Sequence, residues 1–255
     1  MNTGSMATAA PGSALAKRTV RVAVAIGGYP GPERQRRIDA VRAFQSPDTE
    51  VGVVEVPATP YVKNLTPAHM QEAAPAFISA FRDAERQGYD AVLPLGTLDL
   101  GVEGGRSAVN IPVIGPCQSM LQLAAQIGDR FGVISYHDGQ IPLFRAMIRR
   151  YGMENWVAGF ATTGFRLVEM ASNSQAVGEL FLECARKLVR EQGADVVIAM
   201  GISQCPLIVG AQAASEHAGV PVLEGIGTPI HVAASMARLG LTQSPVRWPR
   251  AAEVG

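Results

Sequence analysis

Apolar residues recur along the chain in two alternating patterns, one typical of strands and one of helices. The run VRVAVAI ends at the turn signal GGYPGP, and residues 33–44 then carry apolar side chains at helical spacing. A second strand-like run, EVGVVEV, precedes a longer helical pattern over residues 67–87. YDAVLPLG (89–96) is apolar almost throughout, as strands buried on both faces are. This alternation predicts parallel sheets joined by crossover helices.

The second half of the chain repeats the order of the first. RQGYDAVLPLG (86–96) matches EQGADVVIAMG (191–201) at a constant offset of 105, and NIPVIG (110–115) matches GVPVLEG (219–225) at an offset of 109. Two unrelated α/β units can share such a pattern, but here order and spacing persist over a whole unit. We therefore predict an α/β fold of two pseudo-twofold-related lobes, each a mostly parallel sheet with flanking helices.

The repeat also suggests boundaries for the parts of the chain. We expect a flexible N-terminal tail at 1–18, a first lobe at 19–115 completed by a C-terminal helix at 228–241, a second lobe at 116–227, and an extended tail at 242–255.

Composition narrows the classes of partner. Of 255 residues, 47% are hydrophobic, and 22 Lys and Arg balance 22 Asp and Glu. Zero net charge favours neither nucleic acid nor a membrane surface, and no run is long enough to span a bilayer. The three cysteines are widely spaced without a CxxC pair, which fits a reducing cytoplasm and supports neither disulfides nor a metal site. A small molecule is the expected partner.

Two strand-end loops are expected to face each other across a cleft, since open α/β sheets bind ligands at the carboxyl ends of their strands. The first holds Gly96 and Thr97, and the second holds Gly201, Ser203 and Cys205. A hydroxyl suits an oxyanion, and a thiol can move a proton to or from carbon. We expect helix N-termini around the second loop to favour the thiolate.

Further candidates lie at other strand ends. Cys117 opens a helical pattern, so the helix dipole is expected to lower its pKa. Tyr136 and His137 follow the strand FGVISY, and we expect Gly28 and Tyr29 to form the symmetry-related loop, with Tyr29 in the place of Tyr136 or His137.

Several chemistries are excluded by their missing signatures. The chain has no GxxxxGK[ST] loop and no dinucleotide-binding glycine pattern, so nucleotide binding is not favoured. It has neither a GxSxG elbow nor an HExxH helix, which excludes the common serine hydrolase and zinc protease signatures.

These residues resemble the aspartate/glutamate/hydantoin racemase superfamily from about residue 20 to residue 241. The stretches SPDTEV, RSAVNIPVIGPCQSMLQLAA, RFGVIS, RRYGME and AGVPVLEG are most similar to the hydantoin racemase branch. The resemblance implies two α/β lobes, no cofactor, a homo-oligomer, and two catalytic cysteines, one from each lobe.

The sequence departs from that cysteine pair. The first cysteine position falls at Gly96, and the second falls within 201–205, at Gln204 or Cys205 when the downstream match is the anchor. One thiol opposite a Gly-Thr loop is similar to the arylmalonate decarboxylase branch. That resemblance implies that Thr97 joins the oxyanion pocket, that Cys205 is the acid, and that Tyr136 or His137 is the pocket residue.

The sequence thus predicts a cofactor-independent carbon-acid enzyme that uses a single thiol next to a carboxylate or cyclic carbonyl, as a decarboxylase, lyase or isomerase. One alternative is a hydantoin- or amino-acid-type racemase with Cys117, His137 or Asp99 as the second base. The other is a non-catalytic binding protein for a small molecule, which burial of Cys205 away from the cleft would favour.

Overall fold

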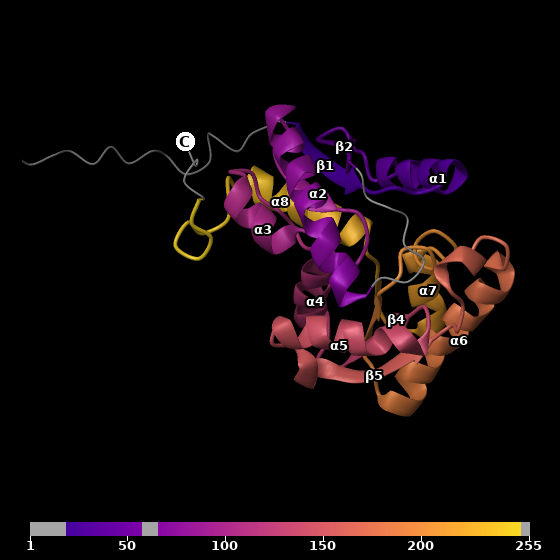
Figure 1. Ribbon diagram of the computed structural model, residues 1–255. Helices are drawn as coiled ribbons and strands as arrows, with labels where there is room; N and C mark the ends of the chain where they lie inside the picture. Colours follow the sequence, from indigo (N-terminus) through magenta and orange to yellow (C-terminus); the bar gives the residue numbers. More distant parts are fainter. Residues whose placement is uncertain (1–18, 58–65, 251–255) are drawn as a thin grey trace, which may run out of the picture.

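The computed structural model describes residues 19–57 and 66–250, and the expected N-terminal tail at 1–18 lies outside them. Within these ranges the strands form two sheets, ordered β2-β1-β3 and β5-β4-β6-β7. The strands of both sheets pair in parallel, and Figure 1 shows the two sheets in separate lobes, each with its own helices. The predicted α/β fold class is confirmed.

The described strands are short, and most of the helices between them span two turns or more. The strands are β1 (Val20–Ile26), β2 (Thr49–Glu55), β3 (Ala91–Pro94), β4 (Phe131–Ser135), β5 (Val157–Thr162), β6 (Val196–Ala199) and β7 (Val222–Leu223). The α-helices are α1 (Gly31–Arg42), α2 (Pro67–Arg86), α3 (Val102–Ala108), α4 (Pro116–Ile127), α5 (Ile141–Arg150), α6 (Ser174–Gln192), α7 (Ala211–Ala218) and α8 (Gly227–Arg238). Short 3-10 helices lie at η1 (Asp138–Gln140), η2 (Glu154–Trp156) and η3 (Leu167–Glu169). Several prolines occupy the first turn of a helix, where the missing N–H leaves no hydrogen bond unmade.

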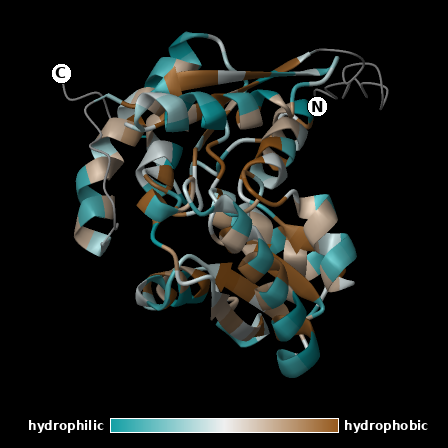
Figure 2. Cartoon of the chain, turned by 90° about the vertical axis from the view of Figure 1, so that its right-hand side faces the viewer, coloured by the Kyte–Doolittle hydropathy of each residue, from teal (hydrophilic) through white to brown (hydrophobic). Residues whose placement is uncertain are grey.

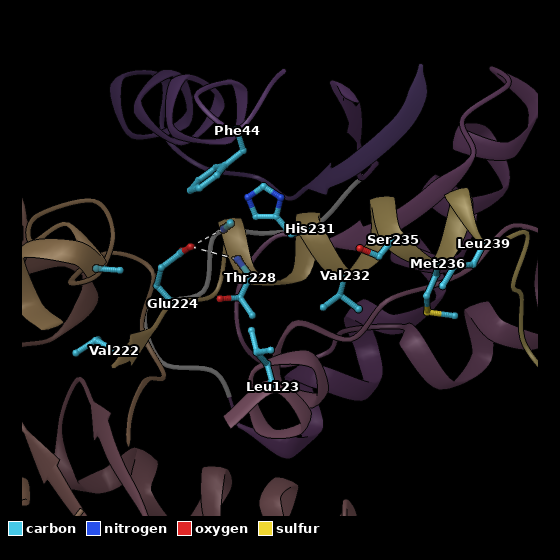
Figure 3. A pocket seen from close by; sticks show the side chains of 12 residues that line it. Phe44, Leu123, Val222, Glu224, Thr228, His231, Val232, Ser235, Met236 and Leu239 are labelled. Atoms are coloured by element: carbon cyan, nitrogen blue, oxygen red, sulfur yellow. Dashed lines mark hydrogen bonds between the residues drawn. The ribbon is translucent and has the colours of Figure 1, made fainter. Parts of the chain in front are cut away.

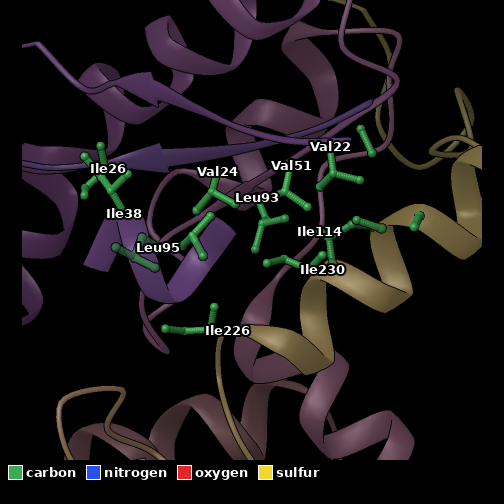
Figure 4. Packing of buried hydrophobic residues seen from close by; sticks show 14 of the residues in the cluster. Val22, Val24, Ile26, Ile38, Val51, Leu93, Leu95, Ile114, Ile226 and Ile230 are labelled. Atoms are coloured by element: carbon green, nitrogen blue, oxygen red, sulfur yellow. The ribbon is translucent and has the colours of Figure 1, made fainter. Parts of the chain in front are cut away.

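β1 is buried on both faces because successive side chains of a strand point in opposite directions. One face of the first sheet packs against α1 and α8, and Figure 4 shows Val22 and Val24 in the same cluster as Ile230 of α8. Ala23 and Ala25 lie in the cluster on the other face, with residues of α2 and α3. α8 therefore packs on the first sheet although it follows the last strand of the second.

β6 alternates in the same way in the second lobe. Val196 and Ile198 lie in one cluster with α4 and α5, whereas Val197 and Ala199 lie in another with α6 and α7. Figure 2 shows hydrophobic residues concentrated on the strands. Burial on two faces is the reason that these strands read as continuous apolar runs in the sequence.

The two lobes repeat each other in register. β3 and β6 have the same length and lie 105 positions apart. The N–H of Asp90 donates to the carbonyl of Arg21 at 2.7 Å, and that of Asp195 donates to the carbonyl of Arg130 at 3.0 Å. The pseudo-twofold relation expected from the sequence repeat therefore holds at the level of backbone hydrogen bonds.

The strand register corrects one expected equivalence. Val22 pairs with Ala91 in the first sheet, as Phe131 pairs with Val196 in the second, so β1 and β4 correspond at an offset of 109. The counterpart of Tyr136 is then Gly27, that of His137 is Gly28, and Tyr29 corresponds to Asp138. The expectation that Tyr29 takes the place of Tyr136 or His137 was wrong, because register and not residue type decides which side chains are equivalent.

The described part of the C-terminal tail, expected to be extended, turns back on the first lobe. The N–H of Trp248 donates to the carbonyl of Ser244 at 2.9 Å and closes a turn. The Arg106 guanidinium of α3 lies over the Trp248 ring, 5.1 Å from its centre, and the indole N–H donates to Glu103 at 3.2 Å.

Candidate active site at the strand ends

The loops after β3 and β6 meet at a glycine near the end of the second lobe. A Cβ built on Gly225 would lie 2.5 Å from the Thr97 methyl and 3.2 Å from an Ile202 methyl. Thr97 is 6% exposed and Ile202 is 4% exposed, so both side chains are nearly enclosed. Because β3 and β6 correspond at an offset of 105, Ile202 is the counterpart of Thr97. Methyl groups of Thr97 and Ile202, one from each lobe, therefore lie together beside Gly225.

The neighbouring glycines are also symmetry-related, but their surroundings differ. Gly96 has φ +102°, a conformation that favours glycine, and no atom lies within 4 Å of the point where its Cβ would be. At Gly201 the same point lies 2.4 Å from the Tyr136 ring. The first lobe thus leaves open space at its strand end, whereas the second fills the equivalent space with a phenol.

Tyr136 is half-buried and hydrogen bonded through its hydroxyl. The N–H of Ser203 donates to the phenol oxygen at 3.1 Å. Burial raises the pKa of Tyr136 above its ordinary value, although hydrogen bonds from Ser203 and the charge of Arg37 act in the opposite direction. The phenol is therefore protonated at neutral pH and can donate a proton.

Arg37 connects the two lobes at this site. The guanidinium lies on α1, is 1% exposed, and donates through Nη2 to Ser203 Oγ at 2.7 Å. It lies 4.2 Å from the centre of the Tyr29 ring and is ion-paired with Glu33. Burial lowers the pKa of Arg37, but Tyr29, Glu33 and Tyr136 together raise it, so the group stays charged.

Nothing in the sequence distinguished Arg37 from its neighbours. Arg34 and Arg36 share the same helix and residue type, but their side chains are about one-third exposed. Helical periodicity identifies the buried face, yet it does not show that an arginine on that face meets a loop of the other lobe.

Among the described residues, three buried polar side-chain atoms on or next to the strand-end loops and α1 have no hydrogen-bond partner. They are Arg37 Nε, His137 Nε2 and Gln204 Oε1. Gln204 is fully buried, and its amide nitrogen donates to Thr163 Oγ1 at 2.7 Å. Buried polar groups are usually paired, so orphans at a strand end indicate a place prepared for a ligand.

Cys205 lies apart from these groups. It is 0% exposed and belongs to the apolar cluster between the second sheet and the helices α6 and α7, together with Ile134 and Phe181. Burial, and then the Glu224 carboxylate, raises the pKa of Cys205, so the expectation that nearby helix N-termini favour the thiolate was wrong. The thiol is therefore part of the second-lobe core.

Cys117 is buried too, on the inward face of α4. Its N–H donates to Asp99 Oδ1 at 2.8 Å, and its side chain lies in the cluster between α4 and the second sheet. Burial and the Asp99 charge raise its pKa well above the ordinary value, which contradicts the expected lowering by the helix dipole. At this depth desolvation outweighs the dipole.

Asp99 was a candidate for the second base, but its carboxylate oxygens are engaged in hydrogen bonds within the protein. Its carboxylate accepts the N–H groups of Cys117 and Gln118 at the start of α4 and the Tyr151 hydroxyl at 2.6 Å. Burial raises its pKa, and these three hydrogen bonds oppose the shift. Asp99 therefore caps α4.

A separate pocket of about 460 Å³ runs along α8, and sequence reasoning missed it. Figure 3 shows it between Phe44, Leu123 and α8, with Glu224 at one end. Glu224 accepts the N–H groups of Ile226 and Gly227 at 2.7 and 2.6 Å, so its carboxylate caps α8. Most of the lining is apolar.

Two further findings bear on the expected partners. In residues 19–57 and 66–250, no three His, Cys, Asp or Glu side chains converge as a metal site. No helix in the same ranges is long and apolar enough to cross a bilayer.

Two pseudo-symmetric lobes with polar loops between them are the architecture of an α/β enzyme of the racemase superfamily. The family model for Asp/Glu/hydantoin racemases matches residues 35–237, and the chain belongs to that family. The resemblance found in the sequence is confirmed.

Individual relatives agree with this assignment. The chain is 26% identical over 187 residues to a hydantoin racemase of Rhizobium meliloti, covering 71% of this chain and 76% of that protein. In fold it is similar to allantoin racemase from Klebsiella pneumoniae, with a TM-score of 0.82 at 20% identity over 92% of this chain and 96% of the other. Unliganded arylmalonate decarboxylase is more distant, with a TM-score of 0.61 at 15% identity over 86% and 93%.

Proposed function

We propose that the chain is a cofactor-independent enzyme acting on a carbon acid next to a carboxylate or a cyclic carbonyl. The observation that carries the proposal is the open space beside Gly96, the residue before Thr97, in a strand-end site that also holds Tyr136 and Ser203. Hydrogen-bond donors placed where negative charge develops are the main requirement for stabilising an enolate.

The polar groups are suited to that charge. Ser203 Oγ accepts a hydrogen bond from Arg37, and the Ser203 side chain also interacts with the Tyr136 hydroxyl, so the three polar groups form one cluster. The buried Arg37 cation adds a favourable field close by. Thr97, which follows Gly96 in the chain, carries a further hydroxyl.

The substrate class is supported by what the similar proteins are named for. Hydantoin and allantoin carry a hydrogen on a ring carbon beside a carbonyl, and an arylmalonate carries carboxylates on one carbon. Loss of that hydrogen, or of one carboxylate as carbon dioxide, leaves a similar anion at the carbon. We therefore expect a small carboxylate or cyclic amide as substrate, and decarboxylation, another lyase reaction or isomerisation as the chemistry.

Cys205 was the acid expected from the sequence, and its burial argues for another group. The symmetry-related pairs Gly96 and Gly201, and Thr97 and Ile202, carry no titratable side chain. A symmetric exchange of protons between two thiols is therefore not part of the proposal.

Turnover in deuterated water tests the proposed function. The full chain is incubated with each enantiomer of 5-benzylhydantoin and of allantoin, and with 2-methyl-2-phenylmalonate, and products are analysed by mass and by chiral chromatography. We expect one class to be converted with deuterium at the reacting carbon. Ligand binding with no change of mass or optical purity in any substrate would instead favour the non-catalytic alternative. Inversion with deuterium uptake would agree with the proposed function and identify the chemistry as isomerisation by a racemase with a second base.

A further inference from the structure

We infer that Tyr136 is the proton donor of this site and that it acts on one face of the substrate only. This inference deepens the proposed function and rests on it. The lack of a matching group in the first lobe, the placement of the phenol and its hydrogen bonds support the assignment.

Tyr136 has no equivalent in the other lobe. The strand register gives Gly27 as its counterpart, so the first lobe carries no side chain at that position. The ring covers Gly201, whereas the equivalent space at Gly96 is open. One half of the pseudo-symmetric site is therefore filled by a phenol and the other half is free for a ligand.

The hydroxyl of Tyr136 is held in place by Ser203. Its oxygen accepts the Ser203 N–H at 3.1 Å, and the Ser203 side chain also interacts with it. Arg37, from the first lobe, is near enough for its charge to lower the pKa of Tyr136 and therefore to stabilise a phenolate. The phenol is thus directed toward the junction of the lobes.

With a malonate as substrate, decarboxylation precedes proton transfer. The bond between the α carbon and one carboxylate breaks, carbon dioxide leaves, and the electron pair stays on the α carbon and the remaining carboxylate as an enediolate. The Tyr136 O–H gives its proton to the α carbon, and the phenolate takes a proton from water. A single donor on one face gives one enantiomer.

Tyr136→Phe tests the assignment with 2-methyl-2-phenylmalonate in deuterated water. General acid catalysis contributes about 100-fold to 10,000-fold, so we expect the rate to fall at least about 100-fold with little change in KM. The enantiomeric excess of the residual product should also fall, since water then delivers the proton to either face. A merely structural tyrosine would not change that excess.

Tyr89→Phe is the matched control. Tyr89 lies in the first-lobe cluster, where its hydroxyl is close to Gly52, and the substitution removes the same atom away from the strand ends. Wild-type rate and enantiomeric excess are expected. With an enantiopure hydantoin, a site with one proton donor on one face is expected to give no inversion.

The outcomes separate the two proposals. If the wild-type chain converts none of the panel, the proposed function fails and the inference with it. If the wild type is active but Tyr136→Phe keeps the wild-type rate and enantiomeric excess, or if the wild type inverts hydantoins, only the inference fails. Loss of selectivity in His137→Gln with Tyr136→Phe unaffected would move the donor to His137, whose Nε2 is also buried without a partner.

Discussion

The Arg37 guanidinium and the Ser203 hydroxyl meet at 2.7 Å although 166 positions separate them in the chain. The bond joins the first helix of one lobe to a strand-end loop of the other. It places a buried cation beside Tyr136 and Tyr29, at the centre of the proposed site.

Arg37→Lys is expected to destabilise the protein, because a lysine cannot keep the hydrogen bonds to both Ser203 and Glu33. Loss of a hydrogen bond to a buried charged group costs about 1–3 kcal/mol. Urea denaturation measures the change in unfolding free energy. Arg34→Lys, on the same helix with its side chain about one-third exposed and ion-paired to Glu55, keeps its charge and should change it by less than about 0.5 kcal/mol. Equal effects of both variants would contradict the buried bridge.

Thr97→Val removes one hydroxyl and keeps the shape of the side chain. If Thr97 stabilises the enolate, the rate should fall by about 100-fold to 1,000-fold, the usual cost of losing one oxyanion donor. The rate with the substrate identified from the panel is the measurement. Thermal unfolding should change little, and an active Thr97→Val would remove Thr97 from the oxyanion pocket.

Gly201→Ala places a methyl group where the Tyr136 ring lies, 2.4 Å from the nearest ring atom. The ring must shift, so we expect a rate loss similar to that of Tyr136→Phe and a destabilisation of about 1–3 kcal/mol. Gly210→Ala is the control, since no atom lies within 4 Å of its Cβ position and its φ is −63°. Steady-state kinetics and urea denaturation of both variants test the steric argument.

Cys205→Ala distinguishes a thiol acid from a phenol acid. The thiol lies in an apolar cluster, so we expect a stability loss of about 1–3 kcal/mol from the smaller side chain, with turnover retained. Abolished turnover in a folded Cys205→Ala protein would restore the single-thiol mechanism expected from the sequence and overturn the role given to Tyr136.

Glu224 should make stability depend on pH in a defined direction. Burial raises its folded-state pKa above the ordinary 4.5, despite the N–H groups of α8 that it accepts. Between the ordinary and the raised pKa the folded state binds more protons than the unfolded state, so the unfolding free energy falls as pH rises through that window. Urea denaturation across it should show a shallower fall for Glu224→Gln, and an unchanged slope would contradict this role for the carboxyl.

The internal repeat could be predicted from the sequence because a buried strand shows as a run of apolar residues whose length matches that of the strand. Val92 and Val197 occupy matched positions in strands buried on both faces, and their N–H groups donate to the carbonyls of Pro112 and Pro221, each at 2.9 Å. A periodic apolar pattern is enough to predict such units and their order.

Less of the candidate site could be predicted from the sequence. Thr97, Tyr136 and Ser203 do follow strand ends, and their place in the site stays a prediction. No sequence pattern singles out Arg37, and Cys205 was expected to line the cleft. Whether a loop residue points into a cleft or into the core depends on the local path of the backbone, and the path after β6 directs Cys205 toward α6 and α7.

The sequence by itself determined two α/β lobes, their pseudo-twofold relation and the strand ends at which chemistry is placed, because these follow from local hydrophobic periodicity and from glycine and proline in turns. Only the tertiary structure decided that the side chains of Thr97 and Ile202 meet at Gly225, that a phenol covers Gly201, and that Arg37 bridges the lobes. Those relations depend on strand register and on contacts between residues distant in the chain, and no local pattern of residue types records them.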